Sequence, residues 1–322
     1  MREISFSNAL NEAILEEMRR DESVIVLGED VGYFGGPFHI TNGCFEEFGQ
    51  MRAMDTPISE TAIIGASVGA AVTGLRPIPE IMYVDFIGVC TEQIINQAAK
   101  RAYVFGAKVP IVLRVTEGAG WRSGPHHSQT LHSMFMNIPG LKLVLPSTPY
   151  NAKGLLKSSI RDDNPVIFFE NRVLYDRKGG VPEEEYLVPL GEADVKREGD
   201  DVTIIATQVM VHEALKAAEE LENKGTSVEV IDPRTIIPLD KDTIVNSVKK
   251  TGRVLIADES CVTGSAQSEI AAVLAEEAFF SLEAPIKRIG VPDVPIPFSP
   301  VLEDAILPTK DTMVKEIEAL LS

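Results

Sequence analysis

The sequence predicts an α/β protein of two domains, each a mostly parallel sheet with helices on both faces. Strand-like and helix-like segments alternate along the chain, the pattern of parallel sheets joined by crossover helices. The length of 322 residues suits two domains of ordinary size. A polar, acid-rich stretch with Gly179-Gly180 interrupts the alternation. We therefore expect a first domain over 1–178, a linker or crossing segment over 179–200 and a second domain over 201–322.

The elements expected in the first domain follow from local patterns. Ser7 can cap a first helix that runs to Arg20 and carries one apolar stripe. The apolar strand over 24–30 ends in two acids, where a parallel strand opens into a functional loop. The further segments are a small-residue helix over 61–73, a strand over 78–86, a helix over 91–104, strands over 109–115 and 141–147, a helix over 151–161 and a strand over 165–171.

The second domain repeats this alternation. Its strands are expected over 201–207, 227–233, 253–259 and 286–292, and its helices over 210–223, 240–250, 264–279 and 311–320. Both domains therefore have the pattern of sheets buried on two faces.

Charge and cysteine content exclude several classes of protein. The net charge of -18 argues against nucleic acid and membrane lipid as partners, because both bind basic surfaces. It is compatible with a basic protein partner, or with solubility alone. The three cysteines show no C-x-x-C spacing, which disfavours a disulfide framework or a zinc site. The N-terminus has no signal or transit character, and residues 61–75 are too short to span a bilayer. We expect a bacterial or archaeal cytoplasmic protein.

Common enzyme motifs are absent. The stretch GAGWRSG over 118–124 departs by one residue from the dinucleotide-binding fingerprint and lacks its ribose-binding acid. The chain has no Walker sequence, no H-E-x-x-H and no G-x-S-x-G. The ordinary hydrolase and nucleotide-enzyme interpretations therefore lack their central residues.

Several longer segments occur together in a specific order. They are DTPISE, GLRPIPEIMYVDF, PHHSQ, PGLKLVLPSTPYNAKGLLKSSIRDDNPVIFFEN and VIDPRTIIPLD. In this order they resemble the β subunit of the decarboxylating component of 2-oxo acid dehydrogenase complexes, a family that includes the pyruvate, branched-chain and acetoin enzymes. The resemblance runs from about residue 3 to the end. It implies a transketolase-like pyrimidine-binding domain, a smaller C-terminal domain and an α2β2 heterotetramer.

The missing half of the cofactor site agrees with this resemblance. Thiamine-diphosphate enzymes hold the diphosphate through magnesium, which needs hard oxygen ligands supplied by a G-D-G motif and a later Asn-Asn. This chain has neither, and Gly199-Asp200-Asp201 is the nearest sequence. The α subunit is therefore expected to hold magnesium and the diphosphate. A self-sufficient transketolase-like enzyme is disfavoured for the same reason.

The resemblance, together with the expected strand pattern, assigns five residues to thiamine diphosphate. Glu60 matches the catalytic glutamate, which hydrogen-bonds the aminopyrimidine, favours its imino tautomer and so leads to the reactive ylide. Phe86 matches the ring that stacks on the pyrimidine, and Met82 would share its strand face. Glu29 matches a second acid near the cofactor, and Ile58 would touch the pyrimidine edge. Taken alone, Glu60 also suits a helix N-terminus, and the Met-Phe pair suits a plain core.

A histidine and a potassium site are also implied. His127, directly before Ser-Gln, matches the active-site histidine that assists acyl transfer, while the adjacent His126 departs from the family and suggests a substrate-specific role. The implied potassium ligands are the Asp162 and Asn164 side chains and main-chain oxygens near Ile111, Ser159 and Ile160. The sequence D-D-N-P equally favours a simple turn.

The implied activity is that of an oxidoreductase. With thiamine diphosphate it decarboxylates a 2-oxo acid, pyruvate or a branched-chain acid, and reductively acylates lipoamide on an acyltransferase. The acyltransferase would bind through its lipoyl and subunit-binding domains, and the latter is basic, which fits the acidic chain. Acetoin is the alternative substrate, because residues 84–100 and 118–120 look acetoin-like. A non-catalytic scaffold subunit is a further alternative, disfavoured by the joint presence of Glu60, Phe86 and His127.

Overall fold

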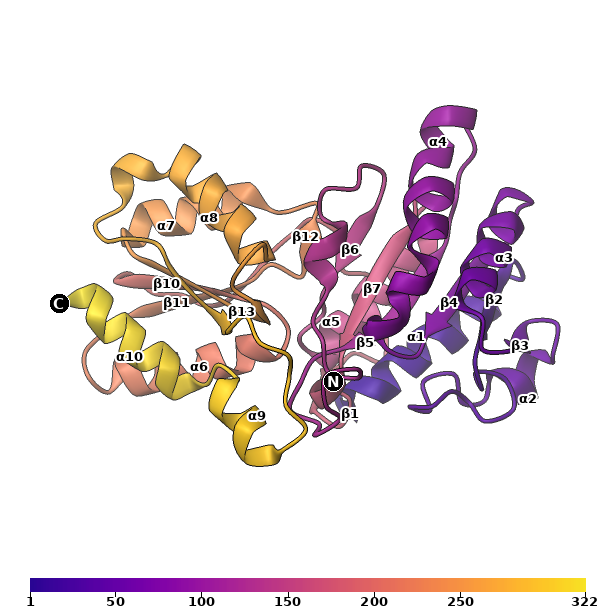
Figure 1. The fold of residues 1–322 in the computed structure, drawn as a ribbon, viewed down its shortest axis with the longest axis horizontal. Coiled ribbons are helices and arrows are strands. Elements are labelled where there is room, and N and C mark those ends of the chain that lie inside the picture. The colour runs from indigo at the N-terminus through magenta and orange to yellow at the C-terminus, as the bar shows by residue number, and fades with distance from the viewer. The chain divides into compact units, whose positions relative to one another are not determined.

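The computed structural model describes all 322 residues, which form two compact units (Figure 1). Unit 1 comprises Met1–Glu117 and Met134–Leu190. Unit 2 comprises Gly118–Ser133 and Gly191–Ser322. The short segment Gly118–Ser133 thus belongs to the second unit although its sequence position lies inside the first domain, which the sequence did not lead us to expect.

Unit 1 is built on a parallel sheet. From one edge to the other its strands are β6 (Lys142–Val144), β7 (Val166–Asn171), β5 (Val112–Glu117), β4 (Arg76–Ile81), β2 (Val24–Gly28) and β3 (Ala53–Asp55). The central strands β2, β5 and β7 are buried along their whole length, as a sheet covered on both faces requires. Antiparallel β1 (Arg2–Ser5) and β8 (Lys178–Val181) form a separate pair.

The helices of unit 1 pack on this sheet and on one another. They are α1 (Phe6–Arg20), α2 (Cys44–Phe48), α3 (Glu60–Val72), α4 (Ala99–Phe105) and α5 (Pro149–Arg161). Helix α1 packs along α5, and Lys153 and Lys157 both reach the carboxylate of Glu16 at 2.6 and 2.8 Å. The cap of α1 is Ser5, which accepts from the Asn8 N–H at 3.1 Å. The expectation that Ser7 caps is wrong, because the helix begins before it.

The chain after β4 differs from the predicted strand over 78–86. Strand β4 ends at Ile81, and a 3-10 helix, η1 (Val84–Cys90), follows, then a π-helical turn, η2 (Gln93–Ala98), that leads into α4. The buried residues of η1 are Val84, Ile87 and Cys90. Their spacing of three matches the 3-10 repeat rather than the alternation of a strand. Met82 and Phe86 therefore do not share a strand face.

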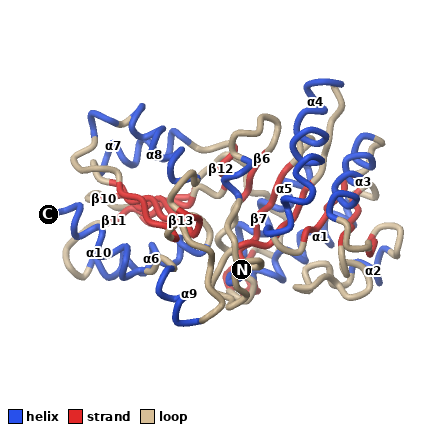
Figure 2. Tube along the Cα trace, in the orientation of Figure 1, coloured by secondary structure: helices blue, strands red, loops and turns tan.

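Unit 2 has a five-stranded sheet. Its order is β14 (Lys287–Val291), β13 (Val254–Cys261), β10 (Val202–Ala206), β11 (Val228–Asp232) and β9 (Asp194–Arg197). Only the edge strand β9 runs antiparallel to its neighbour. Helices α7 (Lys241–Thr251) and α8 (Ala266–Glu277) cover one face, and α6 (Val209–Glu222) and α10 (Lys310–Leu321) cover the other (Figure 2). The predicted fold class is confirmed.

Some short elements were not predicted from the sequence. They are helix α9 (Pro300–Ile306), strand β12 (Thr235–Ile237), the edge strand β9 within the predicted linker, and the 3-10 turns η3 (His132–Phe135), η4 (Arg172–Leu174) and η5 (Phe279–Ser281). Each is too short to leave a clear hydrophobic period in the sequence.

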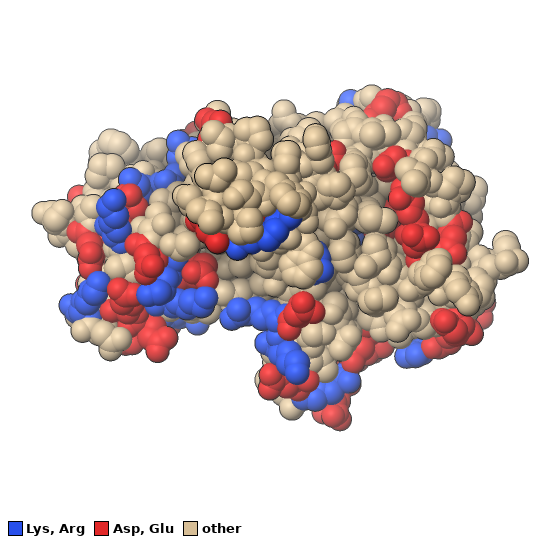
Figure 3. Space-filling view, turned by 60° about the horizontal axis from the view of Figure 1, so that its bottom comes forward, with Lys and Arg blue, Asp and Glu red and all other residues tan.

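The surface carries mixed charge. On the face drawn in Figure 3, lysine and arginine side chains lie among aspartate and glutamate side chains, without a broad uninterrupted basic area. None of the helices has both the length and the apolar character that crossing a membrane requires.

Candidate functional site

Three carboxylates gather at the carboxyl edge of the unit 1 sheet. Glu29 follows β2 directly, Glu80 lies near the end of β4, and Glu60 is the first residue of α3. In open parallel sheets this edge is the usual place for ligands. Burial, and then the negative charges of Glu60, Asp30 and Glu80, raise the pKa of Glu29. The structure thus brings Glu29 and Glu60 close enough for the charge of one to affect the protonation of the other.

Exposed apolar side chains occur close to the start of α3, where Glu60 stands. The Thr61 hydroxyl donates to the Val89 carbonyl at 2.8 Å, which ties the start of α3 to η1. Ile58 is 82% exposed and Val89 is 60% exposed, so both present apolar surface beside this helix start. The thiol of Cys90 has its pKa raised to about 12 by burial and, next, by the charge of Glu60. Glu60 therefore stands where α3 meets η1.

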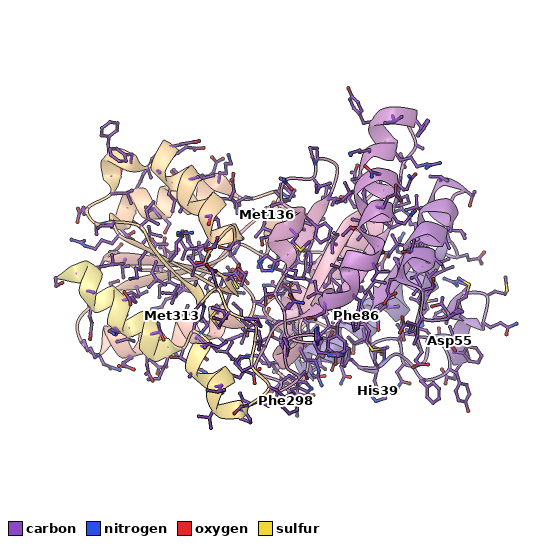
Figure 4. All side chains as sticks on the ribbon, in the orientation of Figure 1. His39, Asp55, Phe86, Met136, Phe298 and Met313 are labelled. Atoms are coloured by element: carbon purple, nitrogen blue, oxygen red, sulfur yellow. The ribbon has the colours of Figure 1, made fainter.

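An aromatic cluster stands beside this edge. Phe86 contacts Tyr83 edge-on, with ring centroids 6.3 Å apart, and Tyr83 contacts Phe38 at 5.6 Å. Phe86 is half-buried and is marked in Figure 4. Met82, also half-buried, follows β4 directly. Met82 and Phe86 thus lie in unit 1, as Glu60 does. Met82 lies in the turn after β4 and Phe86 in the 3-10 helix η1, rather than on the predicted strand.

Beneath the carboxylates lies a buried charge network that the sequence analysis missed. The Arg114 guanidinium donates to both oxygens of Glu170, at 2.7 and 2.8 Å, and its third arm bonds Glu80. The Tyr175 hydroxyl donates to Glu170 at 2.8 Å and also hydrogen-bonds the Thr116 hydroxyl. An arginine inside the otherwise apolar strand VPIVLRV was the signal for this network, because such a residue needs buried acids around it.

The glycine-rich loop after β2 is held by one carboxylate. Asp55, at the end of β3, accepts from the Gly32 and Tyr33 N–H groups at 2.6 and 3.2 Å. A Cβ at Gly32 would lie 2.9 Å from the Asp55 oxygen, so only glycine fits without a shift. The loop is therefore a shaped part of the sheet edge.

The predicted histidines belong to unit 2. His127 is half-buried, His126 is exposed, and the His127 N–H donates to the Gly124 carbonyl at 3.3 Å. A cavity of about 390 Å³ lies beside them, with Ser128–Leu131 on one wall and Glu259–Cys261 on another. His127 and Glu60 therefore belong to different units.

The predicted potassium ligands lie around a tight turn after α5. The Asp162 carboxylate accepts from the Asn164 N–H at 2.8 Å and bonds Lys142. Arg76 donates to the Ile160 and Asp162 carbonyls, both at 2.9 Å. The other two predicted carbonyls, those of Ile111 and Ser159, accept backbone N–H groups. Arg76 and Lys142 already supply positive charge here, which favours the turn interpretation, and potassium binding stays a prediction.

The residues of unit 1 suit one half of a cofactor. The Glu60 carboxylate, at the start of α3, can hydrogen-bond a ring nitrogen, and α3 packs on η1, which carries the aromatic ring of Phe86. In contrast, no cluster of three or more His, Cys, Asp or Glu side chains is arranged to hold a metal ion.

Comparison with known proteins identifies the family. The family model for the transketolase pyrimidine-binding domain matches residues 2–178, and that for the transketolase C-terminal domain matches residues 191–313. The acetoin:2,6-dichlorophenolindophenol oxidoreductase subunit beta of Bacillus subtilis (strain 168) is 50% identical over 99% of this chain and 98% of its own length. The chain belongs to the dehydrogenase β-subunit family. The resemblance inferred from the sequence motifs is thereby confirmed.

Other members of the dehydrogenase β-subunit family are nearly as similar. The 2-oxoisovalerate dehydrogenase subunit beta of the same organism is 49% identical over 96% of this chain and 95% of that protein. The pyruvate dehydrogenase E1 component subunit beta of Chaetosphaeridium globosum is 45% identical over 99% of both. Among solved structures, a split-gene transketolase described as an inactive β4 tetramer is 25% identical, with a TM-score of 0.81 over 99% of this chain and 98% of that one.

Proposed function

We propose that this chain is the β subunit of a thiamine-diphosphate-dependent 2-oxo acid dehydrogenase and acts with an α subunit in an α2β2 heterotetramer. The observation that carries the proposal is the pair Glu29 and Glu60 at the carboxyl edge of the unit 1 sheet, where α3 packs on η1, the element that carries Phe86. When bound, thiamine diphosphate supplies an electron sink for the carbon next to the keto group. The α subunit would hold its diphosphate and magnesium.

Each residue of this chain has a defined task in the proposal. Glu60 shares a proton with a ring nitrogen of the aminopyrimidine. Glu29 carries a raised pKa, so it limits the negative charge next to Glu60. Phe86 and Ile58 hold the ring and exclude water from it. His127 donates or accepts a proton at the substrate oxygen and assists transfer of the acyl group to lipoamide.

The comparisons identify the family of this chain but do not select its substrate or its cellular location. Identities of 50%, 49% and 45% to acetoin, 2-oxoisovalerate and pyruvate relatives differ too little to select one substrate. Acetoin is the second candidate, because the acetoin relative is the most similar of these three. We also propose docking of the acyltransferase by its basic subunit-binding domain. A rice relative is named as chloroplastic, so the bacterial or archaeal cytoplasmic location stays a prediction.

The test is Glu60→Gln in the purified complex of α and β chains. Pyruvate, branched-chain 2-oxo acids and acetoin are assayed in parallel with an artificial electron acceptor, and the active substrate identifies the enzyme. We expect the substitution to lower kcat about 100-fold or more, because it removes the shared proton and leaves the shape unchanged. Glu46→Gln, an exposed glutamate in α2, is the matched control. Full activity of Glu60→Gln would contradict the proposal.

A further inference from the structure

The segment Gly118–Ser133, which carries His126 and His127, is anchored at its C-terminal end by a buried hydrogen bond between a histidine and a carboxylate. The His132 Nε2 lies 3.0 Å from the Asp258 Oδ2, and both side chains are almost completely buried. The Ser260 N–H donates to the other Asp258 oxygen at 2.8 Å. Burial alone would raise the pKa of Asp258, but the charge and hydrogen bond of His132, with the bonds from Ser260, outweigh it and lower the pKa. Asp258 is therefore held as a carboxylate against His132.

A second buried carboxylate anchors the other end. Glu303 of α9 is fully buried, and it accepts from the Gly120 N–H at 2.7 Å and from the Arg122 guanidinium at 2.7 Å. Arg122 also pairs with Asp304 at 2.6 Å and bonds the Pro300 carbonyl. Hydrogen bonds to buried charged groups are stronger than bonds between neutral groups. We therefore expect Glu303 to restrain the backbone around Gly120 and Arg122.

Between its anchors the segment closes on itself. The Gly118 N–H donates to the Gln129 carbonyl at 3.0 Å. This bond joins the two ends of residues 118–129, which we call the histidine loop. At the tip Gly124 adopts a positive φ of 73°, and a Cβ there would lie 3.2 Å from the Phe298 ring. Phe298, marked in Figure 4, stands just before α9. His126 and His127 thus project from a loop held at both ends and backed at the tip.

We propose that Asp258 and Glu303 are positioning residues for His127. They fix the backbone on both sides of the histidine, and reaction rates are sensitive to displacements of about 1 Å in such a group. This inference rests on the role proposed for His127. It means that buried carboxylates of unit 2 fix the position of the backbone that carries His127. Neither carboxylate needs to touch substrate or cofactor for this.

The segment contains its own reporters. Trp121 is the only tryptophan of the chain, so intrinsic tryptophan fluorescence of the purified chain reports on this segment alone. Arg122 is the only lysine or arginine between 118 and 133, so tryptic cleavage after Arg122 reports its release. Both measurements use the full-length chain, and kcat and KM are measured on the complex with the α subunit.

The variants are Asp258→Asn and Glu303→Gln, which keep shape and remove charge. The matched control is Glu229→Gln, another buried carboxylate of unit 2, which pairs with Lys250 away from the segment. We expect both test variants to lower kcat about 10- to 100-fold with little change in KM. They should also speed cleavage after Arg122, shift the Trp121 emission and weaken the same limb of the kcat–pH profile that His127→Gln removes. Glu229→Gln should change none of these.

Two outcomes separate this inference from the proposed function. If His127→Gln lowers kcat while Asp258→Asn and Glu303→Gln keep wild-type kcat, the positioning role is wrong and the catalytic role stands. If His127→Gln itself is fully active, the proposed role of His127 fails, and the positioning role fails with it.

A second variant covers the case in which Glu303→Gln does not fold. Arg122→Lys retains the tryptic site and the positive charge. A lysine ammonium lacks the fork with which the guanidinium bonds Glu303 and Asp304 together, so the anchor should loosen. We expect faster cleavage at this position and a lower kcat. A wild-type kcat and cleavage rate would overturn the inference.

Discussion

The Arg114 network allows a direct test of how much a buried ion pair contributes beside the proposed cofactor site. Arg114 and Glu170 are 2% and 1% exposed, and Glu80 is 8% exposed. Arg114→Met leaves the two carboxylates buried without a counter-charge. Removing one partner of such a pair costs about 3–5 kcal/mol. With a urea m-value of about 2 kcal/mol per M, the unfolding midpoint should fall by about 1.5–2.5 M.

The chain offers a matched control in the same unit. Arg19 bonds both oxygens of Glu47 at 2.6 Å, which is the same two-pronged contact, but the two side chains are 53% and 38% exposed. Arg19→Met should cost about 0–1 kcal/mol, because water already screens the pair. The two contacts differ in burial and in the second carboxylate, Glu80, that Arg114 also bonds, so the comparison sets a buried network against an exposed pair.

The assay must read unit 1 separately, since two-unit proteins do not unfold in one step. Hydrogen exchange of peptides from β5 and β7, followed along a urea series, does this. The pH dependence gives a second check. In Arg114→Met the buried acids have pKa values above those of the unfolded chain, so their protonated forms favour folding and the variant should recover stability, relative to wild type, as pH falls toward about 5. Equal losses for the two variants, within about 1 kcal/mol, would refute the reasoning.

Two further predictions concern unit 1. Glu60→Gln should lower the pKa of Glu29, because the charge of Glu60 contributes to raising it; NMR titration of labelled glutamate side chains measures this, and an unchanged pKa would mean that the two groups do not interact. Gly154→Ala should cost about 1–3 kcal/mol in urea unfolding, because its Cβ would lie 2.4 Å from Val188 Cγ2. Gly69→Ala, in α3 with open space around it, should instead stabilise by about 0.5–1 kcal/mol. Similar effects of the two alanines would argue against close packing of Gly154 on Val188.

The parts of the structure that local pattern determines were predictable. The alternation of apolar strands and amphipathic helices indicated the fold class, because the hydrophobic periodicity of each element can be read from neighbouring residues in the sequence. Met82 and Phe86 show where this fails. The run over 78–86 is compatible with either a strand or a helix. In the structure β4 pairs with β5 only as far as Ile81, so the residues after Ile81 leave the sheet and form a 3-10 helix.

The candidate site could be proposed from the sequence only where a motif carries it. Glu60 and His127 were named through short motifs that resemble a family, and their roles stay predictions, whereas their surroundings come from residues far away in the chain. Arg114 with Glu170, and His132 with Asp258, are separated by 56 and 126 residues. These residues meet only in the folded chain, so neither the composition nor the spacing of motifs in the sequence indicates which residue pairs with which.

The order in which the anchors are made has a consequence for biosynthesis. Gly120 and the glutamate that holds it are 183 residues apart. At translation rates of about 5–20 residues per second, the histidine loop waits roughly 10–40 s for that glutamate to be synthesised. A nascent chain halted before α9 therefore lacks the Glu303 anchor, and its histidine loop is held only at the His132 end until α9 is synthesised.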